Sequence, residues 1–326
     1  MPGVALVLGA GGMVGQAFHA GVLSALADEL GWDARDADLL VGTSAGSIVA
    51  TMLRAGMPPA DIVRWGCDLP LSPEGAAIVE RTGSAPPLRP LRQLASREIA
   101  SPALLRRAAR APWAVTPGAL AAALLPEGRV PTEELAAPIA ELVGPAWPDA
   151  PTWIVAVQLD TGRRTVFGRD GAPAATPAEA LRASCAIPAL FEPAVIGGER
   201  YVDGAVHSST NADLVASLPD PPPDLVVISA PMAPLRTPSP MRRVPRPSPQ
   251  QAIRRLARLA LARELAALRE RGIRVVVFRP SSADLARMNG DTLDPANFAP
   301  VAESAAESAR RRLARPEVRE HLSVLA

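Results

Sequence analysis

The sequence contains no lysine, so all 34 basic residues are arginines, and 33 acidic residues balance them. The resulting net charge of +1 provides no excess of positive charge for nucleic-acid phosphates. Aromatic residues make up only 3% of the chain, which leaves few rings on which bases or sugars could stack. We therefore expect no nucleic-acid partner.

Cysteines are also scarce, and only Cys67 and Cys185 are present. Two cysteines do not make a disulfide framework, and no Cys or His spacing typical of a metal site occurs, so no metal is expected. The sequence lacks a run of 18 apolar residues, and it enters an apolar strand pattern almost at once rather than through a secretory signal. We expect a cytoplasmic protein that contacts a membrane only at its surface.

Hydrophobic residues are abundant at 48%, which is ample for the core of a large domain in a chain of 326 residues. Short apolar runs alternate with helical patterns, which predicts an α/β fold whose mostly parallel or mixed sheet is covered by helices on both faces. We expect a single domain with its core at 3–56 and 150–280 and C-terminal helices at 281–326.

The segment 57–148 differs from this core because it is rich in proline and shows no strand pattern. It is predicted to be a helical insertion beside or above the site, or ordinary helical packing on one sheet face. The expected helices cover 59–65, 91–110, 116–125 and 131–143.

Two glycine-containing loops near the N-terminus each follow an apolar strand and open a helix. The first strand, 4–8, leads into a glycine-rich loop, and the second, 39–41, leads into a Gly-x-Ser-x-Gly motif centred on Ser44. A serine on such a tight strand-to-helix turn exposes its hydroxyl, and Gly42 and Gly46 avoid collisions between neighbouring side chains. The adjacent helix N-terminus favours negative charge, so Ser44 is the candidate nucleophile.

The glycine-rich loop could supply the matching oxyanion hole through the backbone N–H groups of Gly11, Gly12 and Met13. The competing interpretation is a dinucleotide-binding turn, which requires a third glycine where Val14 stands. It also requires an acid at the end of the second strand, which instead ends in the Ser44 motif. The acyl-transfer interpretation accounts for both loops.

Three motifs in order, 8–15 (LGAGGMVG), 42–47 (GTSAGS) and 201–205 (YVDGA), resemble those of the patatin-like phospholipase family. The resemblance is strong over about 4–213 and implies a three-layer α/β/α fold with a Ser–Asp dyad. It identifies Asp203 as the base, within a motif completed by Gly204 and Ala205. Position alone would favour a turn aspartate, since Asp-Gly is a common turn pair.

The loop departs from many family members, which carry Arg or Lys where Val14 stands, but activity is expected to survive because backbone donors are the larger contribution to oxyanion stabilisation. A Ser–Asp–His triad is the alternative to a dyad, with His207 or His321 in the required chain order. A histidine four residues after the acid is an unfavourable partner, and His19 precedes the nucleophile. Asn211 and Asp213 are interpreted as helix caps.

The function implied by this resemblance is a serine acyl hydrolase of the phospholipase A, lysophospholipase or esterase type. It would cleave lipid esters through an acyl-serine intermediate without a cofactor. Acyl transfer to an alcohol or amine by the same dyad is one alternative, and a non-enzymatic lipid-binding module is another.

A cluster of seven arginines without an acid occupies 236–258. It is interpreted either as a solvated surface or as a patch that docks anionic lipid headgroups. Its members are Arg236, Arg242, Arg243, Arg246, Arg254, Arg255 and Arg258. The amphipathic helix expected at 251–271 is predicted to bury one apolar side, formed by Ile253, Leu256, Ala260, Leu261, Leu265 and Leu268.

Overall fold

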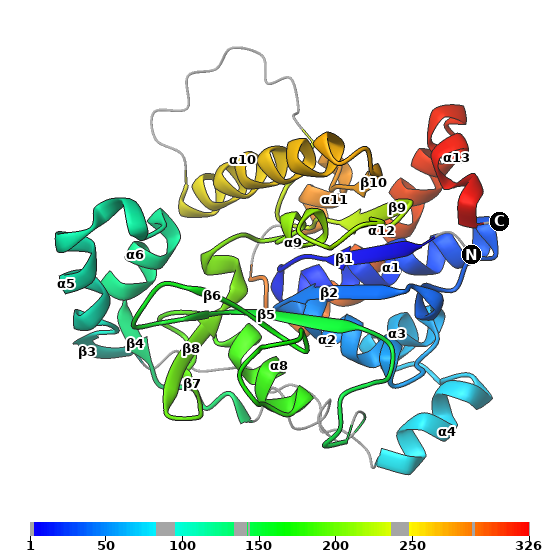
Figure 1. The fold of residues 1–326 in the computed structure, drawn as a ribbon. Helices are drawn as coiled ribbons and strands as arrows, with labels where there is room; N and C mark the ends of the chain where they lie inside the picture. Colours follow the sequence, from blue (N-terminus) through cyan, green and yellow to red (C-terminus); the bar gives the residue numbers. More distant parts are fainter. Residues whose placement is uncertain are drawn as a thin grey trace.

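The computed structural model of the chain describes residues 3–82, 95–133, 142, 144–235, 248–288 and 291–325. Within these ranges an eight-stranded sheet forms the centre of the molecule (Figure 1). Its strands are β1 (Val4–Leu8), β2 (Leu39–Thr43), β5 (Thr152–Gln158), β6 (Arg164–Phe167), β7 (Ala194–Ile196), β8 (Glu199–Asp203), β9 (Leu225–Ser229) and β10 (Arg274–Phe278).

The sheet is mixed, as the alternation of strands and helices predicted. The strand order is β10-β9-β1-β2-β5-β8-β7, with β6 paired to β5 outside this path. From β10 to β5 all neighbours are parallel, whereas β6, β7 and β8 pair antiparallel. The carboxyl ends of the parallel strands therefore meet at one edge of the sheet, where α/β proteins place their sites.

Helices cover both faces of the sheet. They are α1 (Gly12–Leu30), α2 (Ala45–Arg54), α3 (Pro59–Gly66), α4 (Pro73–Thr82), α8 (Pro177–Cys185), α9 (Asp213–Ala216), α10 (Pro249–Glu270), α11 (Ser282–Arg287), α12 (Phe298–Leu313) and α13 (Pro316–Leu322). Single 3₁₀ turns occur at Ala34–Asp36, Pro295–Asn297 and Ser323–Leu325.

Alternating side chains of β1 supply the two halves of the core. Leu6 and Leu8 pack with α1, α2 and α12 on one face, whereas Ala5 and Val7 pack with α9 and α10 on the other. This two-sided burial is typical of a parallel strand within a three-layer protein. The α/β/α layering predicted from the sequence is confirmed (Figure 1).

The segment between α4 and β5 contains strands that the sequence did not reveal. In it, β3 (Ala95–Ile99) pairs antiparallel with β4 (Pro126–Gly128). The predicted helix at 91–110 is therefore wrong over 95–101, since α5 (Pro102–Arg110) begins only after Ser101, whose hydroxyl caps the Leu104 N–H, and 91–94 lie outside the described residues. A Ser-Pro pair starts a helix and disfavours helical backbone before it.

Two further helical turns complete this segment. They are the 3₁₀ turn η2 (Pro112–Ala114) and α6 (Pro117–Leu124), which matches the helix expected at 116–125. The β3–β4 pair, α5 and α6 lie together beside β7 and β8 (Figure 1). A Cβ added at Gly118 would be 2.0 Å from the carbonyl oxygen of Val206, so α6 packs closely on the turn that follows Asp203. Most of the helix predicted at 131–143 lies outside the described residues.

Helix α10 buries only part of the apolar side that the sequence predicted. Ile253 and Leu256 are 53% and 63% exposed, which contradicts their assignment to the core. The buried line runs instead through Ala257, Leu261, Leu265 and Leu268. Leu261, Leu265 and Leu268 are buried as predicted, whereas none of residues 250–256 is buried.

Candidate active site

The sheet register brings the two predicted catalytic residues to the same point. Thr43, the last residue of β2, pairs with Val155 of β5, and Asp203, the last residue of β8, pairs with Ala156. Because β6 pairs with both the Val155 and the Ala156 position, β2 and β8 must share the other edge of β5. They meet end to end there, so the residue after Thr43 arrives beside Asp203.

Ser44 lies on a sharp turn between β2 and α2. Its backbone adopts φ 52° and ψ −119°, a strained conformation for a residue with a side chain. The Ser44 N–H donates to Oγ of Ser184 over 2.9 Å, and that hydroxyl donates to the Val155 carbonyl over 2.7 Å. These two hydrogen bonds anchor the turn to β5. The strained backbone of Ser44 is a feature of nucleophile elbows.

The two elbow glycines are required by close backbone contacts. A Cβ at Gly46 would be 2.0 Å from the carbonyl oxygen of Leu8, and one at Gly42 would be 2.5 Å from Cα of Ser47. Gly46 also donates its N–H to the carbonyl of Gly9 over 3.1 Å. The elbow and the glycine-rich loop are therefore joined directly.

Asp203 is a buried acid within reach of Ser44. It is 4% exposed, and burial raises its pKa from 3.8 to about 6, although hydrogen bonds from the Ser44 hydroxyl and the Ala205 N–H act in the opposite direction. The Ala205 bond measures 2.8 Å. A Cβ at Gly204 would be 2.4 Å from the Val155 carbonyl oxygen, so the motif glycine permits this approach. A carboxylate with a pKa near neutrality is suited to accept a proton.

The glycine-rich loop has backbone N–H groups without partners. Its flanking amides are fixed, since Gly9 donates to Ser229, Ala10 to Ser209 and Val14 to Thr292. Across the described ranges, no acceptor is recorded for the N–H groups of Gly11, Gly12 and Met13. Unpaired amides at the start of α1 are available to bind an anion.

The N–H of Ala45, the residue after the candidate nucleophile, is also without an acceptor in the described structure. Its side chain lies close to the glycine-rich loop, because a Cβ at Gly15 would be 3.3 Å from Cβ of Ala45. The sequence analysis did not name this donor. The available signal was its position, since the residue after an elbow serine commonly contributes an oxyanion-hole amide.

Val14 lies in the hydrophobic core rather than in the site. Its side chain is 1% exposed and packs with those of α1, α2 and α12. A charged side chain at this position would be buried among apolar groups. The departure from a basic residue is therefore consistent with the local packing of this chain.

None of the three histidines, all of which lie in the described structure, has a recorded hydrogen bond to Ser44 or Asp203. His19 is fully buried between the Ser229 hydroxyl and the Gly9 carbonyl, and burial lowers its pKa to about 4. His321 is exposed and bonds the Glu317 carbonyl. The geometry thus favours a dyad over a triad.

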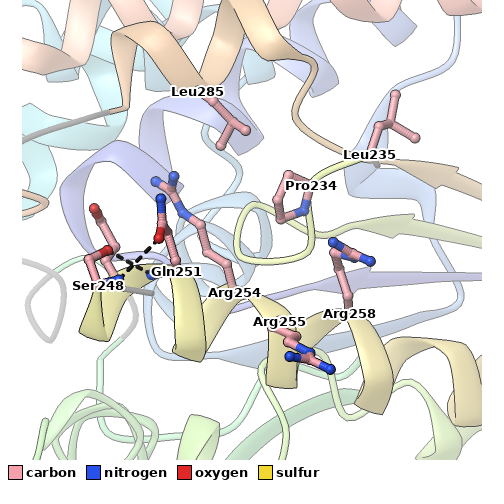
Figure 2. Close-up of a pocket in the computed structure, with 9 residues that line it drawn as sticks. Pro234, Leu235, Ser248, Gln251, Arg254, Arg255, Arg258 and Leu285 are labelled. Carbon is pink, nitrogen blue, oxygen red and sulfur yellow. Dashed lines mark hydrogen bonds between the residues drawn. The ribbon is translucent and has the colours of Figure 1, made fainter. Parts of the chain in front are cut away.

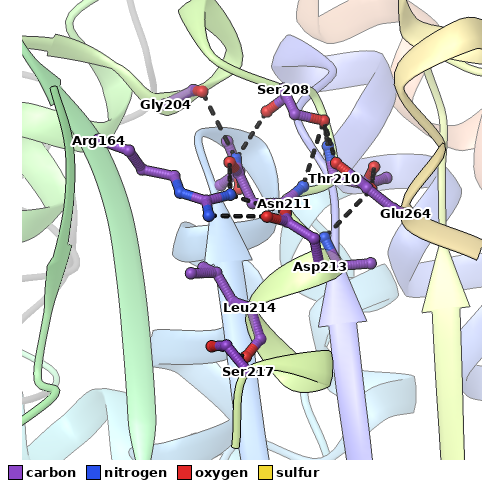
Figure 3. A network of polar contacts seen from close by, with 11 residues as sticks. Arg164, Gly204, Ser208, Thr210, Asn211, Asp213, Leu214, Ser217 and Glu264 are labelled. Carbon is purple, nitrogen blue, oxygen red and sulfur yellow. Dashed lines mark hydrogen bonds and ion pairs between the residues drawn. The ribbon is translucent and has the colours of Figure 1, made fainter. Parts of the chain in front are cut away.

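A polar network on the segment that follows Asp203 was missed by the sequence analysis (Figure 3). Glu264 of α10 accepts hydrogen bonds from the hydroxyls of Ser208 and Thr210 and from the Ala212 N–H. It is 5% exposed, and burial raises its pKa. This carboxylate holds the segment whose Ser209 carbonyl accepts the Ala10 N–H.

The same segment contacts the elbow strand. Asn211 donates from Nδ2 to Oγ1 of Thr43 over 3.1 Å, and Arg164 forms a bidentate pair with Asp213. The prediction that Asn211 and Asp213 cap a helix is wrong, because the N-cap of α9 is Ala212, without a side-chain cap. Both side chains instead fix the segment between β8 and α9 against its neighbours.

Cys185 lies beside the site at the end of α8. Its sulfur is 3.7 Å from Oγ of Ser47, and burial raises the pKa of its thiol, as does the nearby Asp203 carboxylate. Its side chain is buried, with an exposed fraction of 3%. The thiol therefore stays protonated and unreactive.

The described residues contain no group of three His, Cys, Asp or Glu side chains that could hold a metal ion. Among the helices in the described part of the chain, none is both long enough and apolar enough to cross a bilayer.

The fold and the elbow place the chain among the three-layer α/β/α proteins with a Gly-x-Ser-x-Gly motif. The family model described as patatin-like phospholipase matches residues 6–216, so the chain belongs to that family. Membership indicates lipid acyl hydrolase activity at the level of the family as a whole.

Comparison with solved structures includes a match to the crystal structure of VipD from Legionella pneumophila. The two share 12% sequence identity over 96% of this chain, with a TM-score of 0.40. The match covers 66% of the VipD chain, slightly less than two thirds of its length. Among curated proteins, no match is found.

Proposed function

We propose that this protein is a serine acyl hydrolase, of the phospholipase A, lysophospholipase or esterase type, that uses a Ser44–Asp203 dyad. The observation that carries the proposal is the pairing of Thr43 and Asp203 with consecutive residues of β5, which brings the Ser44 hydroxyl close enough to the buried Asp203 carboxyl group to lower its pKa. Two residues about 160 positions apart in the chain are thereby joined at the carboxyl edge of the sheet.

In the first half of the reaction, Oγ of Ser44 forms a bond to the ester carbonyl carbon and its proton passes to the Asp203 carboxylate. Collapse of the tetrahedral intermediate breaks the ester bond, and the leaving alcohol takes that proton. In the second half, Asp203 accepts a proton from water, which attacks the acyl-serine and releases the fatty acid. Ser44 then recovers its proton from Asp203.

The negative oxygen of each tetrahedral intermediate would be bound by the N–H groups of Gly11, Gly12 and Met13, with Ala45 as a further donor. The absence of recorded acceptors for these four amides in the described structure supports this assignment. Loss of one such donor typically costs about 3 kcal/mol of transition-state stabilisation. Backbone donors can therefore sustain catalysis without a basic side chain at Val14.

The test is labelling by a fluorophosphonate probe combined with hydrolysis of a fluorogenic carboxylic ester. Wild type is expected to react with both, whereas Ser44→Ala is expected to react with neither. Ser323→Ala changes an exposed serine on the last turn of the chain and serves as the matched control. Equal labelling of wild type and Ser44→Ala, or no labelling of wild type, refutes the dyad and favours a non-enzymatic lipid-binding module.

Acyl transfer to an alcohol or amine remains the alternative reaction for the same dyad. It is separated from hydrolysis by a product assay in which an added alcohol competes with water. Free fatty acid as the main product at all alcohol concentrations supports the hydrolase, and a saturable ester product supports the transferase.

A further inference from the structure

A pocket of about 550 Å³ lies between the start of α10 and the loops that follow β9 and β10 (Figure 2). One wall consists of Arg254, Arg255 and Arg258 on α10. The facing wall includes Pro234 and Leu235, and Leu285 of α11 closes one side. The pocket therefore combines an apolar wall with a strongly basic one.

The basic wall has no counter-charge. Of the described residues that line the pocket, none is acidic. No described carboxylate forms an ion pair with any of the three arginines. Arg254 donates one long bond of 3.5 Å to the Met288 carbonyl, and its buried Nε atom has no hydrogen-bond partner in the described structure. A buried guanidinium N–H without an acceptor is unfavourable.

More positive charge lies behind the facing wall. Arg279 donates to the carbonyls of Ala233 and Pro234 and so fixes the loop that forms this wall. Burial lowers the pKa of Arg279, and the positive charges of Arg258 and Arg312 lower it further. Burial also lowers the pKa of Arg254, without an opposing carboxylate. The fold therefore holds like charges close together around an open space.

From this arrangement we infer that the pocket is a binding site for a phosphate group, carried either by a lipid headgroup or by a soluble phosphate compound. Guanidinium groups bind phosphate oxygens through paired N–H donors, and Arg254 and Arg258, one turn apart on α10, lie on the same side of the helix, with Arg255 at the edge of the pocket. The volume exceeds that of a single ion, so the remainder of a headgroup also has room.

The site is close to the carboxyl edge of the sheet, as is the dyad. The loop that leads to its facing wall passes through Pro231, which packs against Gly11, since a Cβ at that glycine would be 3.1 Å from Cβ of Pro231. Binding of phosphate does not depend on the chemistry proposed for Ser44. The two proposals can therefore fail separately.

Exposed apolar residues on α10 make it possible to distinguish a lipid headgroup from a soluble phosphate compound. Ile253, Leu256 and Leu259 are more than half exposed on the same helix as the basic wall. Exposed leucines beside arginines fit the boundary between headgroups and acyl chains. They contribute to binding only when the phosphate belongs to a lipid surface.

The first experiment titrates inorganic phosphate into the full chain at low ionic strength and measures heat. Compared with wild type, an Arg255→Gln/Arg258→Gln double variant is expected to bind roughly a hundredfold more weakly, since each of the two lost charged contacts contributes about a factor of ten. Arg263→Gln removes an exposed arginine of α10 that does not line the pocket and is the matched control. Arg254 is retained because of its bond to Met288.

The second experiment measures co-sedimentation with vesicles of phosphatidylcholine, alone or mixed with phosphatidic acid, using Ser44→Ala to prevent hydrolysis. Binding that requires phosphatidic acid, weakens in the double arginine variant and weakens in Leu256→Ser/Leu259→Ser identifies a lipid headgroup. Binding of inorganic phosphate without vesicle binding identifies a soluble compound. Both outcomes support the site.

Two results overturn it. One is the failure of wild type to bind either inorganic phosphate or the phosphatidic acid vesicles. The other is binding that falls equally in the double variant and in Arg263→Gln, because the effect would then be one of bulk charge. Thermal unfolding of each variant shows whether it remains folded, and Arg255→Gln alone replaces the double variant if the latter does not.

Discussion

His19 donates from Nε2 to the carbonyl oxygen of Gly9 over 2.7 Å. A carbonyl oxygen can only accept, so the proton of the neutral ring is on Nε2, and Nδ1 accepts from the Ser229 hydroxyl. The same Gly9 carbonyl accepts the N–H of Gly46. A buried histidine of α1 thus supports the junction between the glycine-rich loop and the elbow.

We predict that His19→Leu lowers the free energy of unfolding by about 2 kcal/mol, because two buried partners lose a hydrogen bond. It should also lower kcat, since the loop carries the proposed oxyanion donors. The control, His321→Leu, changes an exposed histidine and should alter neither quantity. Urea unfolding and steady-state kinetics measure the two effects, and unchanged kcat in His19→Leu would contradict the supporting role.

Stability should also respond to the protonation of His19. Its pKa is about 4 when folded and 6.5 when unfolded, so the unfolded chain takes up a proton that the folded chain refuses. The stabilisation is complete above pH 6.5 and is lost as the pH falls towards 4, amounting to about 3 kcal/mol. Urea unfolding between pH 7 and 4 should show this slope in wild type, and His19→Leu should lack it.

Asp203 is expected to set the acidic limit of activity. A base with a pKa of about 6 is ionised above that pH, so kcat/KM should rise with pH through about 6 and then level off. Asp203→Asn should lower kcat by roughly a thousandfold, because the amide cannot accept the proton. A pH profile in wild type that is flat from pH 5 to 8 would contradict the assignment of Asp203 as base.

The same substitution should stabilise the fold at neutral pH. The pKa of Asp203 in the folded protein lies above the unfolded value of 3.8, so the folded protein favours the protonated form. The protonated carboxyl group therefore contributes to the free energy of unfolding at low pH, and this contribution to stability is lost as the pH rises through about 6. At pH 8, Asp203→Asn is expected to be about 3 kcal/mol more stable than wild type, with no difference below pH 4. Thermal unfolding at the two pH values provides the comparison.

Glu264 is predicted to position the segment between β8 and α9. In Glu264→Gln, the side-chain amide presents donors to hydroxyls that are themselves donors, which should lower stability by about 2 kcal/mol. The kcat should fall roughly tenfold or more with little change in KM, because a shifted segment displaces the elbow and the loop rather than the substrate surface. Glu270→Gln, an exposed change on the same helix, is the control. A loss of stability with normal kcat would reduce Glu264 to a purely structural role.

Val14→Arg is expected to destabilise the protein rather than activate it. The side chain of Val14 is 1% exposed within the core, so an arginine there would bury an unpaired charge at a cost of about 4 kcal/mol. Gln16→Arg, two residues further along α1 at a partly exposed position, should be tolerated. Soluble yield and thermal unfolding test this, and a folded Val14→Arg with higher activity would contradict the prediction.

The elbow, the glycine-rich loop and the mixed sheet were predictable because each depends on local signals, namely apolar runs that end in glycine motifs. Asp203 was predictable only through the family motif, since its pairing with Ala156 is a long-range feature of the sheet. Glu264 was not predictable, because its three partners lie more than 50 positions earlier in the chain. A charged residue on an amphipathic helix gives no sign that it will be buried.

The two errors in element assignment have a similar origin. β3 is stabilised by its pairing with β4, which is a tertiary contact and leaves no apolar alternation in the sequence. Ile253 and Leu256 match the helical period of α10, but both are more than half exposed in the structure. Periodicity predicts which side of a helix is apolar, and it does not predict which turns of that side are covered.

The contact of Gly118 with Val206 places α6, which lies outside the central sheet, next to the turn that follows Asp203. The position of this helix can therefore affect the pKa of the Asp203 carboxyl group. Helix α6 packs on the turn after β8, and the neighbouring Asp203 carboxyl group is buried. Any partner that lifted this helix would hydrate the carboxyl group and make it a stronger acid. Binding of such a partner would shift the rise of kcat/KM with pH to lower pH, although the partner would contact neither Ser44 nor Asp203.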